Sequence, residues 1–486
     1  MFCIRKLPIS TDVNFTRLFL IVILSLLACL FITPPSGLSQ NAFYMIVIFM
    51  ASMVGIMLEV AEPCFVLFLS IGIGTLTNVV EIKQCLTGFS HPVPWLIFFA
   101  LSLSSVITQT SLGLRIAYFF VKTYGGSITG IAYSLIMTEF VVAPIIPSNT
   151  ARGANIGLPI VQSISQYVSA QSDKAQGASI GAYLSILYAY SNAICSAIFI
   201  TAMISNSIIL EEIAKIGINL GWLSWFRVMI IPGLCILLAL PFILKALYRP
   251  NVPDLAHIKI QAAKNFAALG EITSQEKFII SVFAIMLLLW VLSEAIGIPI
   301  IVTVILGICI FLMSGVSRIK DMFSSYSTLN PVIMLGILIS YVNYLISLGA
   351  IDWFNSIISA NLSTFGKDTA FLLLSTIYFL THYFFSGEGS RIIALYTPFL
   401  MTGIAIGITP AKIAFTLAFF SSCSDVLAHY TCPASITIFS LGYVSAGRWM
   451  KTGLVIASFV MIVWFSYVSI VLNSDNHLCG YRIARV

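Results

Sequence analysis

The sequence predicts an all-α polytopic membrane protein, and three observations support that fold class. The 486 residues are 59% hydrophobic and 9% charged, with a mean hydropathy of +1.02, whereas soluble domains carry about a quarter charged residues. Apolar runs long enough to cross a bilayer recur from one end of the chain to the other. Several runs are interrupted by Pro, Gly and polar residues at membrane depth, which is tolerated only where protein or water covers the broken backbone.

The first apolar run, roughly Phe19 to Ile32, follows Arg5, Lys6 and Arg17. This charge pattern resembles a signal peptide, but no convincing small-residue cleavage site is present and further apolar runs follow directly. We therefore expect a first transmembrane helix with a cytoplasmic N-terminus. The apolar runs as a set lie at about residues 16–34, 42–60, 64–80, 94–110, 127–146, 180–205, 226–247, 277–296, 298–314, 330–349, 369–386, 391–408 and 451–472.

The longest polar connection, from Lys245 to Lys277, lies near the middle of the chain. Its basic excess predicts the cytoplasmic side of the membrane. We expect a first half at 1–244 with a first hairpin repeat, a cytoplasmic linker at 245–276, and a second half at 277–486 with a second hairpin repeat. A shorter basic segment contains Arg115 and Lys122.

The two halves correspond at an offset of 239 residues. That offset superimposes Arg152 on Arg391 and Pro159 on Pro398. Each pair follows an interrupted apolar run, and we expect a re-entrant hairpin at both places. Paired broken segments in corresponding positions of two halves are the best sequence pointer to a transporter binding site.

The first interruption is the most informative about chemistry. A Pro and a Gly break the helix on either side of Ser148, Asn149 and Thr150, which supply compact neutral hydrogen-bonding groups. Such groups hold a carboxylate or a small cation without the desolvation cost of a fixed charge. A helix beginning near Thr150 would also direct its positive dipole end toward an anion. Arg152 either adds charge or anchors the hairpin at the interface, and a polar contact between helices is the alternative for the whole motif.

The sequence resembles the divalent anion/sodium symporter family, most closely its branch of citrate, C4-dicarboxylate and plant-type 2-oxoglutarate/malate translocators. The motif Pro-Ser-Asn-Thr-Ala-Arg-Gly at 147–153 carries this resemblance. Further motifs follow in the family's order at 87–97, 110–117, 200–206, 274–277, 382–385, 428–430 and 441–444. The resemblance implies two inverted repeats, each with a re-entrant hairpin and a broken helix. It also implies a homodimer, here expected in a bacterial inner membrane.

The resemblance implies roles for single residues as well. Asn149 and Thr150 would face a substrate carboxylate, and Ser148 with neighbouring carbonyls would face a coupling ion where one is used. Thr201 and Asn206 lie in the corresponding broken region later in the first half, and they are predicted to join the substrate site.

The second half departs from the family at the matching position. Where the family has Ser-Asn-Thr or Ser-Ala-Thr, this chain has Gly387, Glu388 and Gly389, so hydroxyls are missing and a carboxyl group is gained. A charged Glu beside a substrate carboxylate would cost roughly several kcal/mol at low effective dielectric. Three interpretations stay open: Glu388 is protonated, it pairs with Arg391 one helical turn later, or the substrate carries a cationic group.

An ionisable residue inside a membrane is a functional candidate by default, so the site is predicted to include the second-half segment 387–389. The coupling ion is expected to be Na⁺ or H⁺, held by Ser148, Asn149 and Glu388. The altered second-half motif weakens a scheme with two sodium sites. No other cofactor, no catalytic residue and no metal-ligand set is expected.

His429 follows another departure from the family, in which Cys423 replaces an amide and Asp425 adds a carboxyl group. We predict that His429 donates a hydrogen bond to substrate or shuttles a proton, with a polar tie inside the bundle as the alternative. His382 begins the second hairpin and is open to a structural or a functional interpretation.

The predicted function is secondary active transport of small di- or tricarboxylate anions such as succinate, malate, 2-oxoglutarate or citrate, by symport or exchange with alternating access. The alternative is a diverged transporter of an amino-acid-like or inorganic anion that uses Glu388. An enzyme is not expected, because the five histidines are far apart and no HExxH motif occurs. The ten cysteines lack metal-site spacing, and no basic run indicates nucleic acid. The expected partners are the anion, the lipid bilayer and a second copy of the chain.

Overall fold

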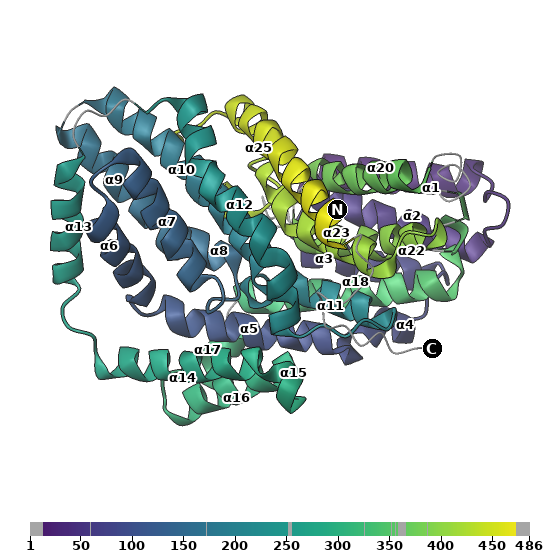
Figure 1. The fold of residues 1–486 in the computed structure, drawn as a ribbon. Helices are drawn as coiled ribbons and strands as arrows, with labels where there is room; N and C mark the ends of the chain where they lie inside the picture. The colour runs from purple at the N-terminus through teal and green to yellow at the C-terminus, as the bar shows by residue number, and fades with distance from the viewer. Residues whose placement is uncertain are drawn as a thin grey trace, which may run out of the picture. The chain divides into compact units, whose positions relative to one another are not determined.

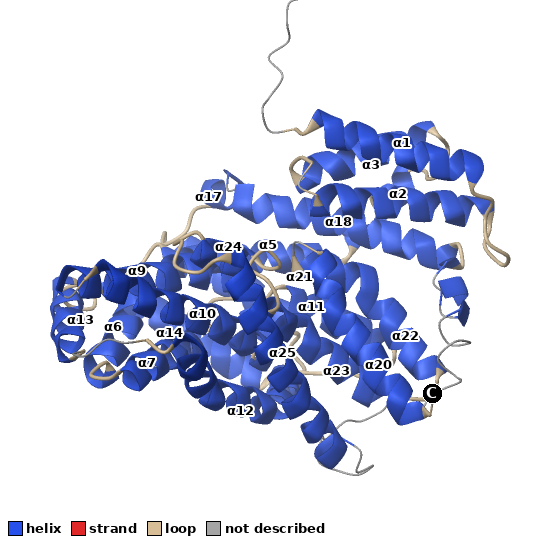
Figure 2. Cartoon of the chain, turned by 90° about the horizontal axis from the view of Figure 1, so that it is seen from above, coloured by secondary structure: helices blue, strands red, loops and turns tan. Residues whose placement is uncertain are grey.

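The computed structural model describes residues 13–472, apart from 59, 172, 251–254, 325, 351, 355, 358–365 and 386. Within these residues, every element of regular secondary structure is a helix (Figure 2). Many of the helices are apolar, and several end in short 3₁₀ or π-helical turns. The all-α prediction is confirmed.

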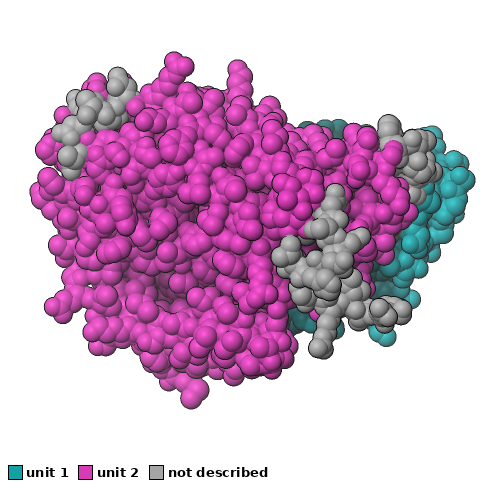
Figure 3. Space-filling view, viewed as in Figure 1, with its two compact units in different colours: residues 1–95, 326–364 teal, residues 96–325, 365–486 magenta. Residues whose placement is uncertain are grey.

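The chain forms two compact units, which Figure 3 colours separately. Unit 1 comprises residues 1–95 and 326–364, and unit 2 comprises residues 96–325 and 365–486. Both units therefore draw on each of the halves predicted at 1–244 and 277–486. The boundaries of those halves and of the linker at 245–276 stay a prediction.

Unit 1 packs its helices through small residues and buried hydroxyls. The Ser70 hydroxyl lies 2.8 Å from the Tyr341 hydroxyl, and the Gly88 amide donates to Ser340 Oγ at 2.7 Å. A side chain at Gly88 would place its Cβ 2.1 Å from the Gly336 carbonyl oxygen, so glycine is required for this close approach. The helices of unit 1 are α1 (Phe15–Phe31), α2 (Gln40–Met57), α3 (Pro63–Leu76), α4 (Ile82–Cys85), η1 (Thr87–Ser90) and α18 (Tyr326–Ser347).

The remaining helices belong to unit 2, except that the unit boundary falls within the first of them (Figure 1). They are α5 (Pro92–Thr108), α6 (Leu112–Tyr124), α7 (Ile128–Val142), α8 (Asn149–Arg152), η2 (Gly153–Gly157), α9 (Leu158–Gln171), α10 (Lys174–Ile198), η3 (Ile200–Ala202), α11 (Ser205–Lys215), α12 (Trp222–Tyr248), α13 (Ala256–Ala268), α14 (Ser274–Val291), α15 (Ser293–Ile296), α16 (Ile300–Met313), α17 (Ile319–Ser324), α20 (Lys367–Leu380), η4 (Thr381–Phe384), α21 (Glu388–Arg391), η5 (Ile392–Tyr396), α22 (Thr397–Ala405), α23 (Pro410–Cys423), η6 (Ser424–Val426), α24 (Pro433–Phe439), α25 (Ala446–Tyr467) and η7 (Val468–Leu472).

The core of unit 2 is built around α10. Every residue of this helix from Ile180 to Ile198 is buried, and the helix packs against α7, α9, α12 and α23. Asp173 caps its N-terminus by accepting the Gln176 amide at 2.7 Å. Helix α23 is equally enclosed from Ile413 to Cys423. These two buried helices position the broken segments that follow each of them, η3 and η6.

Four described helices are long and apolar enough to cross a membrane: Trp222–Tyr248, Ser274–Val291, Thr328–Ser347 and Ala446–Val471. A fifth span results if Pro92–Ile107 and Leu112–Tyr124, which bend by 59°, are taken together. Each apolar run predicted from the sequence overlaps a described helix, but most of those helices are shorter than a full span. The runs omitted α23, because a helix enclosed by protein needs neither the length nor the continuous hydrophobicity of a lipid-facing span.

The predicted linker and the shorter basic segment lie together. The Arg115 guanidinium donates to the Gly270 carbonyl at 2.8 Å and lies 3.4 Å from the Glu276 carboxylate. Nearby, the Lys122 ammonium lies 3.5 Å from the centroid of the Phe266 ring. Arginine and aromatic contacts therefore fix α13 and the start of α14 against α6.

The internal repeat is visible in the secondary structure. The pairs α8 and α21, η2 and η5, and α9 and α22 begin at positions 239 residues apart. In both repeats a four-residue α-helical turn passes into a five-residue π-helical segment before α-helix resumes, and π-bulges of this kind often mark functional sites. The correspondence predicted from Arg152 and Arg391 is confirmed.

Candidate functional site

The candidate site is the place in unit 2 where the tips of the two repeats meet. Ser148 and Gly387 hold equivalent extended positions immediately before α8 and α21. The next residues in each repeat, Asn149 and Glu388, contact each other: Asn149 Nδ2 donates to Glu388 Oε1 at 3.2 Å. Both side chains are buried. The two positions that the sequence offset equates are therefore neighbours in space.

Asn149 is held from several sides. Besides Glu388, its Nδ2 atom donates to Cys432 Sγ at 3.4 Å, and its carbonyl oxygen accepts from Asn192 Nδ2 at 3.2 Å. Its side-chain oxygen accepts the backbone amide of Thr150 at 2.8 Å. The side chain of Asn149 thus connects the first hairpin with the second hairpin and the segment before α24, and its backbone carbonyl connects the first hairpin with α10.

The first-turn amides of α8 have partners in this state of the protein. The Thr150 amide is bound by Asn149 Oδ1, and the Ala151 amide donates to Ser148 Oγ at 3.2 Å. A substrate carboxylate can take these two N–H groups only when the Ser148 and Asn149 side chains turn away from them. The half-buried Thr150 hydroxyl contacts Asn149 Oδ1 at 3.4 Å, so segment 148–150 forms one self-satisfied polar unit.

Arg152 belongs to a buried polar network. Its Nε atom lies 2.6 Å from Glu139 Oε1, and both side chains are fully buried. Its Nη atoms donate to the carbonyls of Ile146 and Ala202 at 2.7 and 2.6 Å, and to Ser196 Oγ at 2.8 Å. Anchoring at the membrane interface is therefore the wrong interpretation of Arg152. Its charge is neutralised by Glu139 and holds the hairpin to the broken end of α10.

Sequence reasoning missed the partners that complete this network. Glu139 also accepts hydrogen bonds from the Tyr188 hydroxyl at 2.6 Å and from Asn192 Nδ2 at 2.9 Å. The only signal in the sequence was an acidic residue inside the apolar run 127–146, which indicates a buried partner of opposite charge. Asn192 is shared, because it also bonds the Asn149 carbonyl.

Arg391 does not pair with Glu388. Its guanidinium instead donates to the carbonyls of Tyr378 and Ser421 at 3.1 and 2.7 Å and to Ser424 Oγ at 2.8 Å. It also lies over the Tyr378 ring, 4.7 Å from the centroid. The structure describes both Arg391 and Glu388 and shows no ion pair between them. The interpretation in which Glu388 pairs with Arg391 is therefore wrong.

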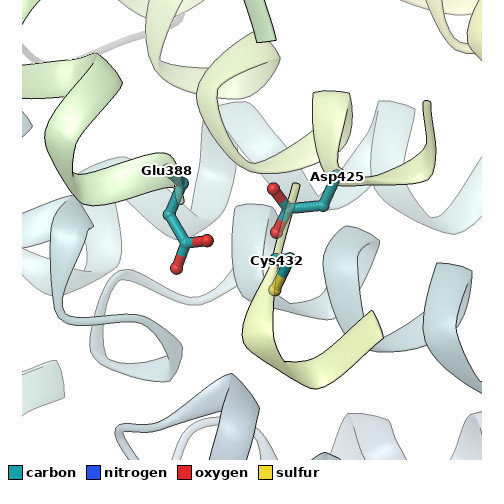
Figure 4. A group of neighbouring side chains, drawn as sticks. All are labelled: Glu388, Asp425 and Cys432. Carbon is teal, nitrogen blue, oxygen red and sulfur yellow. The ribbon is translucent and has the colours of Figure 1, made fainter. Parts of the chain in front are cut away.

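Glu388 lies instead with Asp425 and Cys432 (Figure 4). One ligand atom from each side chain lies within 4.8 Å of the other two, and all three side chains are buried. Asp425 Oδ1 is 2.8 Å from His382 Nε2. Among the described residues, this is a group of side chains whose chemistry could hold a metal ion. Asp425 and His382 were singled out in the sequence, whereas Cys432 was not.

The second-half glycines leave room at the hairpin tip. A Cβ atom at Gly387 would meet no described atom within 4 Å, and one at Gly389 would lie 3.6 Å from Ser205 Oγ, an ordinary contact. Neither glycine adopts a left-handed backbone conformation. Packing therefore does not exclude the hydroxyl residues that the family carries at these positions, and their loss changes the chemistry of the site.

Thr201 and Asn206 lie at the break between α10 and α11. Thr201 Oγ1 donates to the Pro144 carbonyl at 2.9 Å, and Asn206 Nδ2 donates to the Ser196 and Phe199 carbonyls at 2.9 and 3.2 Å. These bonds satisfy backbone groups that the broken helix would leave unpaired. They favour a structural role, and substrate contact by either residue stays a prediction.

We expect Asn206→Ala to lower the free energy of unfolding by about 1–3 kcal/mol, because buried carbonyls lose their donor. The apparent KM for substrate should stay within about twofold of the wild type, since the change removes no contact to segment 148–150. Thermal unfolding of the solubilised protein and uptake kinetics measure the two effects. A large rise in KM at unchanged stability would instead place Asn206 in the substrate site.

His429 makes aromatic contacts. Its ring stacks on Phe439 with 4.0 Å between centroids and lies edge-on to Trp449 at 6.5 Å. Its Nδ1 atom is buried without a hydrogen-bond partner. These contacts place His429 between α24 and α25, and its predicted hydrogen bond to substrate stays a prediction.

Comparison with known proteins gives the family. Residues 12–472 match the profile described as the sodium:sulfate symporter transmembrane region. The chain belongs to this family. The match covers both hairpin repeats and confirms the resemblance to the divalent anion/sodium symporters that the Ser-Asn-Thr motif indicated.

Relatives of this sodium:sulfate symporter family member come from bacteria and plants. The YflS protein of Bacillus subtilis (strain 168) is 31% identical over 438 residues, which cover 89% of this chain and 91% of YflS. The chloroplastic dicarboxylate transporter 1 of Spinacia oleracea is 30% identical, with 89% and 77% covered. The citrate/succinate antiporter of Escherichia coli (strain K12) is 25% identical, with 88% and 92% covered.

A solved structure shares the fold. MtrF of Neisseria gonorrhoeae, described among a class of antimetabolite efflux pumps, superposes with a TM-score of 0.54 at 15% identity, covering 96% of each chain. Family membership makes the chain an integral membrane transporter rather than an enzyme. The predicted function class is confirmed.

Proposed function

We propose that this symporter-family member carries small di- and tricarboxylate anions across the membrane by alternating access between its two repeats. The carboxylates are those named for its relatives in spinach chloroplasts and Escherichia coli. One observation of the structure supports the proposal most directly. The tip of each hairpin reaches the same buried point in unit 2, where Asn149 bonds Glu388, and transporter sites lie at such repeat interfaces.

Substrate would be held mainly by segment 148–150. When the Asn149 side chain releases Glu388 and the Thr150 amide, and the Ser148 hydroxyl releases the Ala151 amide, one side-chain amide donor and two backbone N–H groups become available to a carboxylate. Hydrogen bonds to a charged group are worth about 1.5–3 kcal/mol each, enough to offset the internal bonds that are broken. Opposite movements of the two hairpins would then expose the site to one side of the membrane at a time.

We propose Na⁺ or H⁺ as the coupling ion for symport, with Ser148, Asn149 and Glu388 at its site. Hard cations take oxygen ligands, and the second repeat offers a carboxylate where the family has hydroxyls. This difference disfavours a second sodium site. Exchange of one anion for another without a coupling ion is the other mode, consistent with the antiporter named among the relatives.

The protein is proposed to act as a homodimer in a bacterial inner membrane. Two of the relatives are bacterial proteins covered over about nine-tenths of their length. A symmetric dimer would give each chain its own pair of hairpins, because the contact between Asn149 and Glu388 is made within one chain.

A second candidate substrate follows from Glu388. This carboxyl group lies at the hairpin tip, and one of its oxygens has no hydrogen-bond donor among the residues that the structure describes. An anion that also carries an ammonium group, such as an amino-acid-like substrate, would supply that donor. The substrate panel below distinguishes this alternative from a plain dicarboxylate.

The test is uptake by the purified protein in liposomes. Labelled succinate, malate, 2-oxoglutarate, citrate and aspartate are presented with and without a sodium gradient, a pH gradient and internal counter-substrate. We expect saturable uptake of at least one dicarboxylate above protein-free liposomes. Sodium or pH dependence would assign symport, and dependence on internal anion would assign exchange. Uptake of aspartate alone would support the second candidate, and no uptake of any anion would contradict the proposal.

A further inference from the structure

The group formed by Glu388, Asp425 and Cys432 joins three separate elements. Glu388 is the first residue of α21, Asp425 lies in η6, and Cys432 immediately precedes α24. Figure 4 shows the two carboxyl groups and the thiol turned toward a common point. Three chain segments thus bring side chains that bind metals to one buried position.

Two oxygen atoms of this group have no hydrogen-bond partner among the described residues. They are Glu388 Oε2 and Asp425 Oδ2, both buried, and their residues are only 7% and 1% exposed. Buried polar atoms in folded proteins nearly always have a partner. The two orphaned oxygens belong to different elements, so each separately indicates that a positively charged or donating group completes the site.

The surrounding charges do not supply that group. Arg391 directs its Nη donors to the Tyr378 and Ser421 carbonyls and to Ser424. Arg152 is neutralised by its ion pair with Glu139. The His382 side chain bonds Asp425 Oδ1 and not Oδ2 in the described part of the chain. Two carboxyl groups this close repel each other inside a protein when both are ionised.

We propose that Glu388, Asp425 and Cys432 form a binding site for a divalent transition-metal ion of the Zn²⁺ type. A thiolate with two carboxylates is a mixed S/O donor set that suits Zn²⁺ and does not suit Na⁺ or Mg²⁺. Atoms within 4.8 Å of one another leave a point about 2.8 Å from all three, whereas Zn–O and Zn–S bonds are about 2.0–2.3 Å. Small rotamer shifts close that difference. The Cys432 thiol loses its proton to solvent on binding.

Two neighbours support the three ligands. His382 holds Asp425 through Oδ1 at 2.8 Å, which orients the other oxygen toward the metal. Asn149 Nδ2 contacts both Glu388 Oε1 and Cys432 Sγ. Three protein ligands leave one position of a tetrahedral ion open. Asn149, the predicted substrate-binding residue, contacts two of the three ligand side chains. A carboxylate of the transported anion would therefore fill the open position, and this role of the metal rests on the proposed function.

The metal reduces the conflict between Glu388 and an anionic substrate. Glu388, Asp425 and the Cys432 thiolate carry three negative charges, of which a bound divalent ion offsets two, and the ion attracts a substrate carboxylate by coordinating it directly at its open position. Metal binding and anion binding are thereby linked, and each should strengthen the other by the same factor.

Metal binding is tested first, without transport, using Co²⁺ as a spectroscopic probe. The full-length protein in lipid nanodiscs is titrated with Co²⁺, and a thiolate-to-cobalt charge-transfer band of one equivalent is expected. Cys432→Ser should abolish the band, while Glu388→Gln and Asp425→Asn should weaken Co²⁺ binding by about tenfold or more. Cys85→Ser, which removes a fully buried thiol in unit 1, is the matched control and should leave the band unchanged. Absence of the band in the wild type, or its persistence in Cys432→Ser, overturns the site.

The role in transport is measured separately. Uptake of the best anion is compared in liposomes containing added Zn²⁺ and in liposomes treated with a strong chelator. We expect chelation to lower uptake by at least about tenfold, and Zn²⁺ to restore it. If Co²⁺ binds but no anion is taken up, the metal site stands and the proposed function fails. If uptake is unchanged by chelation and responds only to pH, a shared proton takes the place of the metal and the inferred role of the metal in transport is overturned.

Discussion

Asn149→Ala should abolish uptake while leaving the fold intact. The amide side chain of Asn149 donates a hydrogen bond to Glu388 of the second hairpin, and it is predicted to bind the substrate carboxylate. Each hydrogen bond to a charged group is worth about 1.5–3 kcal/mol, or roughly 10- to 150-fold in affinity. Asn149→Ala removes the contact to Glu388 and the predicted contact to the substrate carboxylate. It should therefore lower the initial uptake rate about 100-fold or more at a fixed low substrate concentration.

Initial rates of labelled anion uptake in liposomes with matched protein content measure this effect. Asn155→Ala is the control, because Asn155 is exposed, lies in the same hairpin and donates its side-chain hydrogen bond to the Ala151 carbonyl one turn earlier. It should retain near wild-type uptake. Size-exclusion profiles and thermal unfolding establish that both variants fold. Wild-type flux through Asn149→Ala would remove segment 148–150 from the substrate site.

The features of the fold that could be predicted from the sequence are those set by residues close together in the chain. The hairpin tips follow from the helix-breaking residues around Ser148 and Gly387, and the repeat follows from the offset between Arg152 and Arg391. The structure confirms that offset down to the π-helical turns η2 and η5. Breaks in a helix can be predicted from the sequence because proline and glycine act on the backbone of their own segment.

The composition of the site was harder to predict, because its members lie far apart in sequence. Asn149 and Cys432 are 283 residues apart, and His382 and Asp425 are 43 apart. Cys432 is one of ten cysteines that lack metal-site spacing in the sequence, and a single cysteine carries no local signal. The Arg152–Glu139 pair was missed for a related reason: Glu139 lies in an apolar run, and only the fold shows that Arg152 turns back toward it.

The two repeats also differ in a way that sequence reasoning did not anticipate. Tyr378 stands 239 residues after Glu139, at the equivalent position, and it receives Arg391 over its ring and at its carbonyl. The equivalent arginines therefore have different partners, a carboxylate in one repeat and an aromatic ring with carbonyls in the other. The arginine of each repeat thus has its hydrogen-bonding and charge requirements met by a different type of residue.

This difference predicts unequal costs for the same substitution. Arg152→Met should lower the free energy of unfolding by about 3–5 kcal/mol, because it leaves the Glu139 carboxylate buried without its counter-charge. Arg391→Met should cost less, about 1–3 kcal/mol, because it leaves only carbonyls, a hydroxyl and a ring unpaired. Reversible unfolding in mixed micelles, or thermal unfolding in one detergent, measures both variants under identical conditions.

A second substitution separates the charge from the packing. In Arg152→Met, adding Glu139→Gln removes the isolated charge while keeping an acceptor for Tyr188 and Asn192. We expect the double variant to be more stable than Arg152→Met alone, with an interaction energy of at least about 1 kcal/mol between the two sites. Simple addition of the two single effects would show that Arg152 stabilises the hairpin through its carbonyl and Ser196 contacts instead. In that case the two repeats would depend on their arginines in the same way, and Arg391→Met should then be as destabilising as Arg152→Met.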